Sequence, residues 1–194
     1  LELALSDLNQ IEKRRTRLKK QISTSKEAKL EDEVLEKLSE GLENENAVRS
    51  ISLTQEEKKV IKPLGLLTQK PIIYATNLGE NELSKGNNFS EEVNDLANKE
   101  GSECIKISAQ VEAELIELGE EERDDYLNGL GVKEGGLISL IKATYSLLGL
   151  STYFTSGQKE TKAWTIFDGM TASQAAGIIH TDFEKGFIRA QTIS

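Results

Sequence analysis

The sequence predicts an α/β protein with an added α+β module, because three different periodicities follow one another along its 194 residues. Residues 1–42 repeat apolar side chains at helical spacing. Residues 70–107 hold two short β-branched runs on either side of a helical pattern, which is typical of a parallel βαβ unit. From residue 152 the pattern changes again: residues 161–166 and 187–193 alternate as strands on either side of a short helix. We therefore expect a helical hairpin, part of a parallel sheet and a small α+β module.

The first segment is expected to form two antiparallel helices. Up to about Ile22, leucine and isoleucine residues fall three, four or seven positions apart, so they share one face of a helix. Thr24 and Glu27 fit a capping box that begins a second helix, and Gly41 lies near the end of that helix. Two helices joined by a few polar residues form an αα-hairpin, whose tip is expected near Ser23.

The central segment is expected to contain two buried parallel strands joined by a helix. An apolar run over residues 70–76 reaches the polar sequence at 77–80, and a second run over 104–107 reaches the one at 108–110. Ser90 is expected to cap the helix between them. The pattern also predicts a capped helix over 54–61, helices over about 112–129 and 134–148, a strand over 161–166, a helix over 172–179 capped by Thr171, and a strand over 187–193.

The charges and the rare residue types exclude several classes of protein. The chain has 24 Lys+Arg against 33 Asp+Glu, and its net charge of −9 argues against a protein that coats nucleic acid, so no DNA partner is expected. One Cys and one His exclude an internal disulfide and a Cys-based zinc site. No apolar run approaches the ~18 residues that span a bilayer, and the first residues lack a basic stretch followed by an apolar one. We expect a cytoplasmic protein with no membrane partner.

One stretch of the chain is strongly basic. Residues 13–20 carry six positive charges, so the other residues together carry −15. This cluster lies just below the expected tip of the hairpin, where it is either a solvated helix face or a surface that contacts phosphates. The candidate RNA or ribosome contacts are Lys13, Arg14, Arg15, Arg17, Lys19 and Lys20.

Motifs for catalysis are absent from this sequence. It has no Gly-x-x-x-x-Gly-Lys-[Ser/Thr] phosphate loop, no Asp-x-x-Gly, no Gly-x-Ser-x-Gly and no His-Glu-x-x-His. The residues therefore do not support catalysis by this segment alone, and the sequence assigns no catalytic or metal-binding residue.

Two polar loops follow the expected strands. Ligands of open α/β sheets bind beyond the carboxyl ends of the strands, where Asn77 and Ser108 both lie. The Asn77 amide can donate to and accept from a purine edge, backbone amides around Ala109 can approach its exocyclic groups, and Leu78 could cover the ring. Capping of the loops by Asn77 and Ser108 explains the same residue types, and spacing alone favours that second interpretation.

Five ordered segments, which together cover nearly the whole chain, strongly resemble the YchF/Obg-like ATPase family: residues 77–80, 107–115, 148–155, 162–166 and 176–190. The last segment is long and unusual, which makes the resemblance far more specific than either loop. Members of this family are translation-factor-class GTPases with a Ras-like P-loop NTPase domain. The resemblance implies a helical coiled-coil insertion over 1–68, the C-terminal half of the nucleotide-binding (Obg-type G) domain over 69–150, and a truncated, ubiquitin-like TGS domain over 151–194.

The resemblance also implies a nucleotide site. The sequence at 77–80 corresponds to the fourth nucleotide motif of the family, with Asn-x-x-Glu in place of the guanine-selecting Asn-Lys-x-Asp. A longer, displaced Glu loses the geometry with which Asp accepts from guanine, so adenine is no longer rejected, and family members favour ATP while accepting GTP. The sequence at 108–110 corresponds to the fifth motif. The implied nucleotide-binding residues are Asn77, Leu78, Glu80, Ser108, Ala109 and Gln110.

The resemblance implies part of a protein that binds and hydrolyses ATP, and GTP less selectively, and that associates with the ribosome or RNA as a translation-linked or stress-linked regulator. The chain is expected to begin after the family's phosphate loop and Mg²⁺ residues and to end before the last TGS strands. Hydrolysis of the acid anhydride is then expected of the whole ATPase/GTPase, and Mg²⁺ is expected on residues outside this chain. The alternative is a non-enzymatic module in which the coiled coil and the TGS domain bind RNA or protein.

Several isolated residues of the second half admit two interpretations. Lys185 and Arg189 are candidate RNA or ribosome contacts, and a solvated strand face explains them equally well. Trp164 is expected to pack in the small module rather than to stack on bases. His180 is expected to be a hydrogen-bonded turn residue rather than a pH-sensitive or RNA-facing group, and Cys104 is expected to pack within its strand.

Overall fold

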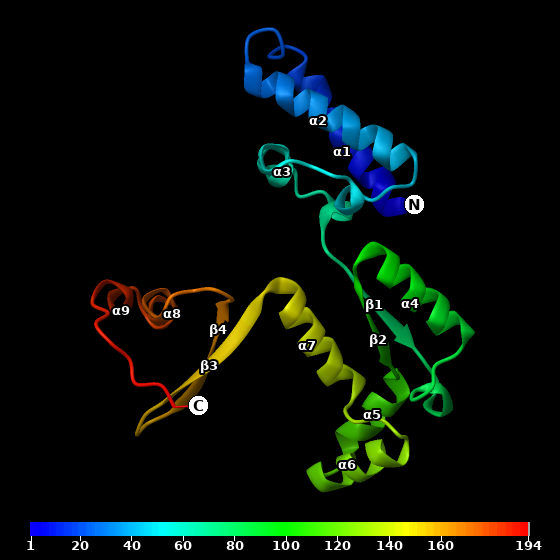
Figure 1. The fold of residues 1–194 in the computed structure, drawn as a ribbon, viewed down its shortest axis with the longest axis vertical. Helices are drawn as coiled ribbons and strands as arrows, with labels where there is room; N and C mark the ends of the chain where they lie inside the picture. Colours follow the sequence, from blue (N-terminus) through cyan, green and yellow to red (C-terminus); the bar gives the residue numbers. More distant parts are fainter. Residues whose placement is uncertain (194) are drawn as a thin grey trace. The chain divides into compact units, whose positions relative to one another are not determined.

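The computed structural model describes residues 1–193 and divides into two compact units, Leu1–Ile72 and a second unit that begins at Ile73 (Figure 1). The first unit is helical, and all strands of the described residues lie in the second. Each unit has an apolar core of its own. No helix among residues 1–193 combines the length and the apolar character needed to cross a membrane.

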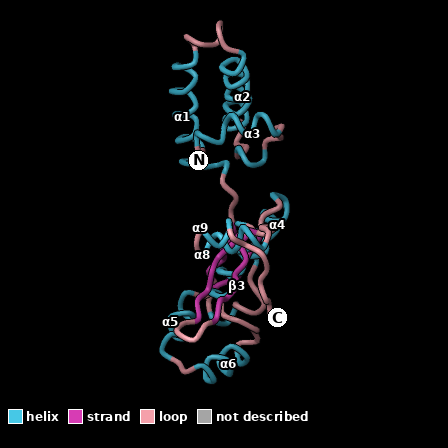
Figure 2. The backbone as a smooth tube through the Cα atoms, turned by 90° about the vertical axis from the view of Figure 1, so that its left-hand side faces the viewer, coloured by secondary structure: helices cyan, strands magenta, loops and turns pink. Residues whose placement is uncertain are grey.

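The first unit is the expected antiparallel hairpin of two helices, α1 (Glu2–Leu18) and α2 (Lys26–Glu43), which lie side by side in Figure 2. Most residues of the predicted apolar stripes meet between the helices and form the core of this unit, whereas Leu1 and Leu5 of the first stripe are exposed. Shorter elements pack against the pair: the 3₁₀ helices η1 (Val48–Ser50), η2 (Lys62–Leu64) and η3 (Leu67–Gln69), and the helix α3 (Gln55–Ile61). The buried core residues are Ile11, Leu18, Ala28, Val34, Leu35, Leu38, Leu42, Val48, Ile61 and Leu66.

Two helix starts in this unit test the predicted capping boxes. At α3 the box is confirmed, because Thr54 Oγ1 accepts from Glu57 N at 3.2 Å and Glu57 Oε2 accepts from Thr54 N at 2.6 Å. At α2 the prediction of Thr24 is wrong. Ser25 is the N-cap there, because its backbone has the extended conformation that a cap needs and its Oγ accepts from Ala28 N at 3.3 Å.

A buried carboxylate fastens α1 to the segment that follows α3. Asp7 has no exposed surface, and its two oxygens accept from Leu67 N at 2.8 Å and from Thr68 N at 2.7 Å. The Thr68 hydroxyl donates to the same carboxylate at 2.7 Å and accepts from Val48 N at 3.2 Å. Asp7 therefore joins α1 to η3 and, through Thr68, to η1.

Replacing Asp7 by alanine is expected to destabilise the first unit by about 2–3 kcal/mol, because buried donors lose their acceptor. Hydrogen exchange of the full chain, followed by mass spectrometry, should show faster exchange in peptides that contain Leu67 and Thr68. Glu12→Ala, which removes an exposed carboxylate from the same helix, is the matched control and should leave exchange unchanged. Equal exchange in the two variants would contradict the role of Asp7.

The second unit begins with the predicted βαβ unit. β1 (Ile73–Asn77) and β2 (Glu103–Ile107) pair in parallel over their full length, so their last residues lie opposite each other. The connecting helix is α4 (Asn88–Glu100). The prediction that Ser90 caps this helix is wrong, because Asn87 is the N-cap. Ser90, three residues later, is its capping-box partner, and its Oγ accepts from Asn87 N at 2.8 Å.

The helical region predicted over residues 112–129 is two helices. α5 (Ala109–Glu117) and α6 (Glu120–Gly129) are separated at Leu118 and Gly119, both of which have extended backbone. The break allows apolar residues of both helices to meet. The buried members of the resulting core are Leu83, Val111, Leu115 and Leu127.

The helix α7 (Gly136–Leu148) agrees with the prediction and leads into an antiparallel hairpin of β3 (Leu150–Ser156) and β4 (Thr161–Phe167). β4 matches the predicted strand. β3 is a strand that the sequence pattern did not reveal. Its partner defines it, because every residue of β3 lies opposite a residue of β4.

After the hairpin, α8 (Ala172–Ile179) begins at the predicted Thr171 cap, and a short helix α9 (Thr181–Lys185) follows. The strand predicted over 187–193 is wrong, because these residues form no strand and Ile188 is 91% exposed. An alternating sequence becomes a strand only where a neighbour completes its ladder, and none of the described strands pairs with this one.

Gly136, at the start of α7, lies against the end of β2 with no room for a side chain. A Cβ there would be 2.9 Å from the Cα of Ile107. Gly136→Ala is therefore expected to destabilise the second unit by about 1–3 kcal/mol, because backbone must move apart. Gly129→Ala at the end of α6, where a Cβ meets nothing within 4 Å, is the control and should be neutral or slightly stabilising. Urea unfolding followed by Trp164 fluorescence measures both, and equal midpoints would contradict the packing argument.

Candidate functional site

The two loops that the sequence singles out lie at one edge of the parallel sheet. Because β1 and β2 are in register, Asn77 lies opposite Ile107, and Leu78 N donates to the carbonyl oxygen of Ile107 at 2.8 Å. Asn77 Oδ1 accepts from the backbone N–H of Ala109 at 3.0 Å. The structure therefore brings Asn77 together with the 108–110 segment.

Asn77 keeps part of its hydrogen-bonding capacity for another group. Its side chain is exposed, and no residue within 1–193 accepts a hydrogen bond from its Nδ2. An amide whose oxygen is fixed by the backbone presents its NH₂ group in a defined direction. A structural tie and a ligand contact are thus compatible roles for Asn77.

Ser108 and Leu78 are the buried residues of the two loops. Ser108 is 1% exposed, and its Oγ accepts from Val111 N at 3.4 Å as the N-cap of α5, which is the capping role that the spacing favours. Leu78 is 7% exposed, so its side chain packs into the protein and offers little surface to a ring. Within the 108–110 segment, solvent reaches Ala109 and Gln110.

A network of polar side chains that the sequence analysis missed borders this edge. Gln110 Nε2 donates to Glu114 Oε1 at 3.1 Å, and the Tyr126 hydroxyl donates to Glu114 Oε2 at 2.5 Å. The bonds from Tyr126 and Gln110 lower the pKa of Glu114. The bond to Glu114, partial loss of solvent and the nearby Glu80 carboxylate raise the pKa of Tyr126 to about 12. The i, i+4 spacing of positions 110 and 114 permits a contact between them on a helix, but it does not single out this pair and gives no indication of Tyr126.

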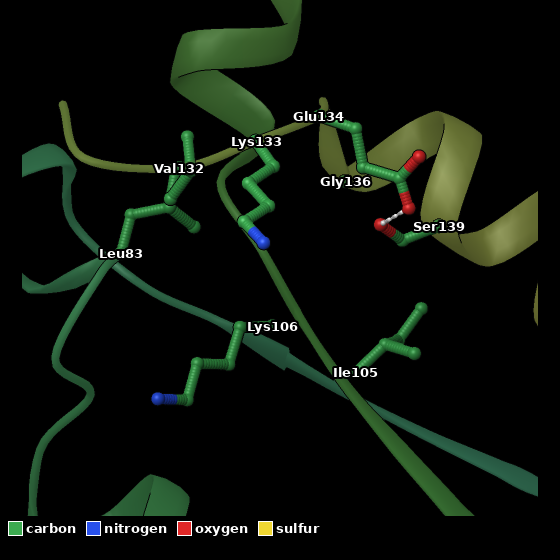
Figure 3. Close-up of a pocket in the computed structure, with 8 residues that line it drawn as sticks. All are labelled: Leu83, Ile105, Lys106, Val132, Lys133, Glu134, Gly136 and Ser139. Atoms are coloured by element: carbon green, nitrogen blue, oxygen red, sulfur yellow. Dashed lines mark hydrogen bonds between the residues drawn. The ribbon is translucent and has the colours of Figure 1, made fainter. Parts of the chain in front are cut away.

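A pocket of about 300 Å³ lies elsewhere in the second unit, beside β2 (Figure 3). Leu83, Ile105 and Val132 give it apolar walls. At the upper right of the view, the Ser139 hydroxyl donates to Glu134 Oε1 at 3.1 Å. None of the predicted nucleotide-binding residues lines this pocket, so it is separate from the edge where Asn77 meets the 108–110 segment.

In the basic cluster of the first unit, the two neighbouring arginines are bound within the hairpin. Arg14 donates to the two oxygens of Glu31 at 2.6 and 2.8 Å. Arg15 donates to Asp32 at 2.9 and 3.3 Å and to Glu36 at 3.0 Å. These bonds raise the pKa of both arginines. The charges of Arg14 and Arg15 are therefore compensated by carboxylates of α2.

The other four cations of the cluster are exposed along the C-terminal part of α1 and in the turn after it. They are Lys13, Arg17, Lys19 and Lys20, and no ion pair within residues 1–193 involves them. Four uncompensated positive charges close to one end of a narrow hairpin create a local positive potential. This end of the hairpin is suited to a polyanionic partner.

The C-terminal candidates lie on the surface of the second unit. Lys185 ends α9 and Arg189 follows it, and both are exposed. Trp164 is half-buried, and its Nε1 donates to Thr155 Oγ1 at 2.9 Å, which agrees with the packing interpretation. His180 is the N-cap of α9, where its Nδ1 accepts a backbone N–H at 3.2 Å, as expected of a hydrogen-bonded turn residue.

Metal-ligating side chains do not converge anywhere in the described part of the chain, where no three His, Cys, Asp or Glu residues form a group that could hold an ion. Cys104 is half-buried in β2, and burial raises the pKa of its thiol. A thiol in this environment is kept in its unreactive, protonated form.

Comparison with known proteins relates these features to one family. The family model YchF-GTPase_C, described as a protein of unknown function (DUF933), matches residues 150–194. The ribosome-binding ATPase YchF of Bacillus subtilis (strain 168) is 47% identical over 197 residues, which cover 100% of this chain and 54% of that protein. The ribosome-binding ATPase YchF of Escherichia coli O157:H7 is 50% identical over 194 residues, which cover 100% of this chain and 53% of that protein.

A solved structure shares the same fold. The Schizosaccharomyces pombe YchF GTPase aligns with a TM-score of 0.84 and 34% sequence identity, over 96% of this chain and 52% of that chain. This chain thus spans about half the length of the curated relatives that it matches. Because the similarity in sequence and in structure extends over nearly all of its residues, the chain belongs to the YchF family.

Proposed function

We propose that this chain is the part of a YchF-type nucleotide-hydrolysing protein that binds the base of ATP and, less selectively, of GTP. The observation that carries the proposal is the meeting of Asn77 with the 108–110 segment, where Asn77 Oδ1 accepts from Ala109 N at 3.0 Å. The carboxyl ends of strands in an open α/β sheet are where ligands bind. The relatives named ribosome-binding ATPase support the same assignment.

In this proposal the chain has three parts. Residues 1–68 are a coiled-coil insertion, 69–150 the second half of a Ras-like P-loop NTPase domain, and 151–194 part of a ubiquitin-like TGS domain. The sequence has no phosphate loop, and the described residues offer no group of metal ligands. The phosphates and Mg²⁺ would therefore be held by residues outside this chain, and hydrolysis would be a property of the whole protein.

The base would lie against Asn77 and the exposed residue Ala109, whose backbone N–H is held by Asn77 Oδ1. The free Asn77 Nδ2 can donate to a ring nitrogen of a purine, and other backbone groups of the 108–110 segment can bond to the exocyclic group. Glu80 occupies the place where related GTPases use Asp to accept from guanine, but here the Glu80 carboxylate lies near the Tyr126 hydroxyl. A site without an acceptor dedicated to guanine does not reject adenine.

Association with the ribosome is proposed for the tip of the hairpin. The first unit has 14 Lys+Arg and 13 Asp+Glu, whereas the second has 10 and 20, so the cations at the tip stand out in an otherwise acidic chain. Ribosomal RNA attracts such a cluster because binding releases counterions from its phosphates. The proposed contacts are Lys13, Arg17, Lys19 and Lys20, supported by Arg14 and Arg15, with Lys185 and Arg189 as further contacts.

The nucleotide proposal is tested by titrating labelled ATP and GTP into this chain and into a longer protein that joins it to a phosphate loop. We expect the longer protein to bind more tightly and to prefer ATP, since phosphate and Mg²⁺ contacts add affinity. Asn77→Ala should weaken ATP binding by about tenfold or more, because a base contact and the loop tie are both lost. Asn94→Ala, which removes an exposed amide from α4, is the control. Equal, negligible binding by both proteins would exclude the nucleotide role.

The ribosome proposal predicts that replacing Lys13, Arg17, Lys19 and Lys20 together by alanine weakens co-sedimentation with ribosomes and flattens its dependence on salt, because fewer counterions are released. A matched variant that replaces Lys58, Lys59, Lys62 and Lys70 removes the same charge from exposed positions of the same unit. It should sediment like the unaltered chain. Identical loss in both variants would indicate a net-charge effect and contradict a contact at the tip.

The alternative function is a non-enzymatic module that binds RNA or protein through the hairpin and the C-terminal part. The four uncompensated cations at the tip favour it, because they need no nucleotide to attract a polyanion. The two functions differ in one result. Ribosome binding that persists in a protein unable to bind ATP or GTP would support the alternative.

A further inference from the structure

The first turn of α5 carries the 108–110 segment, and the side chain of Glu112 leaves the same helix one turn beyond Ser108. Glu112 Oε1 accepts from the backbone N–H of Gly136 at 2.5 Å. Gly136 is the first residue of α7, and the N-cap of that helix, Gly135, has no side chain with which to satisfy the first amides. A carboxylate from α5 therefore caps α7, where it also meets the positive end of the helix dipole.

The same contact brings α7 against the end of β2. A Cβ at Gly136 would lie 2.8 Å from Ile107 Cγ2 and 2.9 Å from Ile107 Cα, so the backbone of α7 approaches as closely as glycine permits. A Cβ at Gly135 would lie 3.1 Å from Glu112 Oε1. Two adjacent glycines thus make room for the strand end and for the carboxylate.

The candidate base-binding segment is consequently held on two sides. Asn77 Oδ1 accepts from Ala109 N at the end of β1, and Glu112 fixes the following turn to α7. Ser108 caps α5 from within and is nearly inaccessible to solvent. Of these three contacts, only the one made by Glu112 joins α5 to α7. Without it, the first turn of α5 would keep its tie to β1 but lose its tie to α7.

We propose that Glu112 is a positioning residue of the candidate nucleotide site, which holds the 108–110 backbone in the orientation that receives the base by capping α7. This inference rests on the proposed function, because the site itself is proposed. Glu112 touches no nucleotide in this arrangement and acts through the backbone of the segment that precedes it. Its side chain carries out this role through an acceptor oxygen, so glutamine can replace it in part.

The first experiment follows hydrogen exchange in this chain without nucleotide. Glu112→Ala should speed exchange of the Gly136 amide and of the first turn of α5 by about tenfold to a hundredfold, because a hydrogen bond to a charged acceptor is lost. Glu112→Gln should restore most of the protection, since its amide oxygen can accept the same bond. Glu117→Ala, an exposed acid at the other end of α5, is the matched control. Exchange that is the same in the alanine variant and the control would overturn the proposal.

The second experiment measures ATP and GTP affinity in the longer protein that carries a phosphate loop. Glu112→Ala should weaken ATP binding by about tenfold and reduce the preference for ATP over GTP, with recovery in Glu112→Gln and no change in Glu117→Ala. Unchanged affinity and preference, together with altered exchange, would make Glu112 a structural cap only and overturn the positioning role. If the unaltered longer protein binds neither nucleotide, the proposed function fails, and the positioning role fails with it even where the exchange result stands.

Discussion

The in-register parallel pairing of β1 with β2 is the constraint on which the candidate site depends. Because the last residues of the two parallel strands lie opposite each other, the segments that follow them lie side by side. The Asn77 side chain can therefore reach the backbone at Ala109. A slip of one residue would turn the side chains of one strand to the opposite face of the sheet and separate these two groups. α4 and α7 both pack against the strands. Ile105 of β2 is buried, and keeping it buried favours a single register.

Those parts of the fold that depend on local sequence could be predicted. The apolar stripes of the hairpin and the capping box at Thr54 are such features, and both are confirmed. The caps predicted at Thr24 and Ser90 are local errors of one and three residues. The larger errors arise where a partner decides the outcome. Alternation over 187–193 says nothing about whether another strand is present to complete a ladder. Likewise the acidic run around Leu118 supports a continuous helix, whereas the packing of α6 against α5 requires a break there.

The candidate site divides in the same way. Asn77 and Ser108 could be found because Asn77 ends a strand and Ser108 directly follows one, and the structure brings their loops together. Glu112, Glu114 and Tyr126 could not be found, because their contacts join one helix to another. Nothing in the spacing distinguishes Glu112 and Glu114 from the many other acidic residues of this chain. The basic cluster also looks uniform in sequence. Its division into compensated and free cations depends on which carboxylates α2 presents to α1.

The two arginine pairs near the tip of the hairpin have a consequence for how that tip would meet a partner. Arg14 and Arg15 each bind a carboxylate of α2 through two nitrogens, the geometry that pairs a guanidinium with a carboxylate most specifically. Partly exposed pairs add little to stability, but they hold the ends of the two helices together. The free cations then project from a preformed frame, so association loses little conformational entropy.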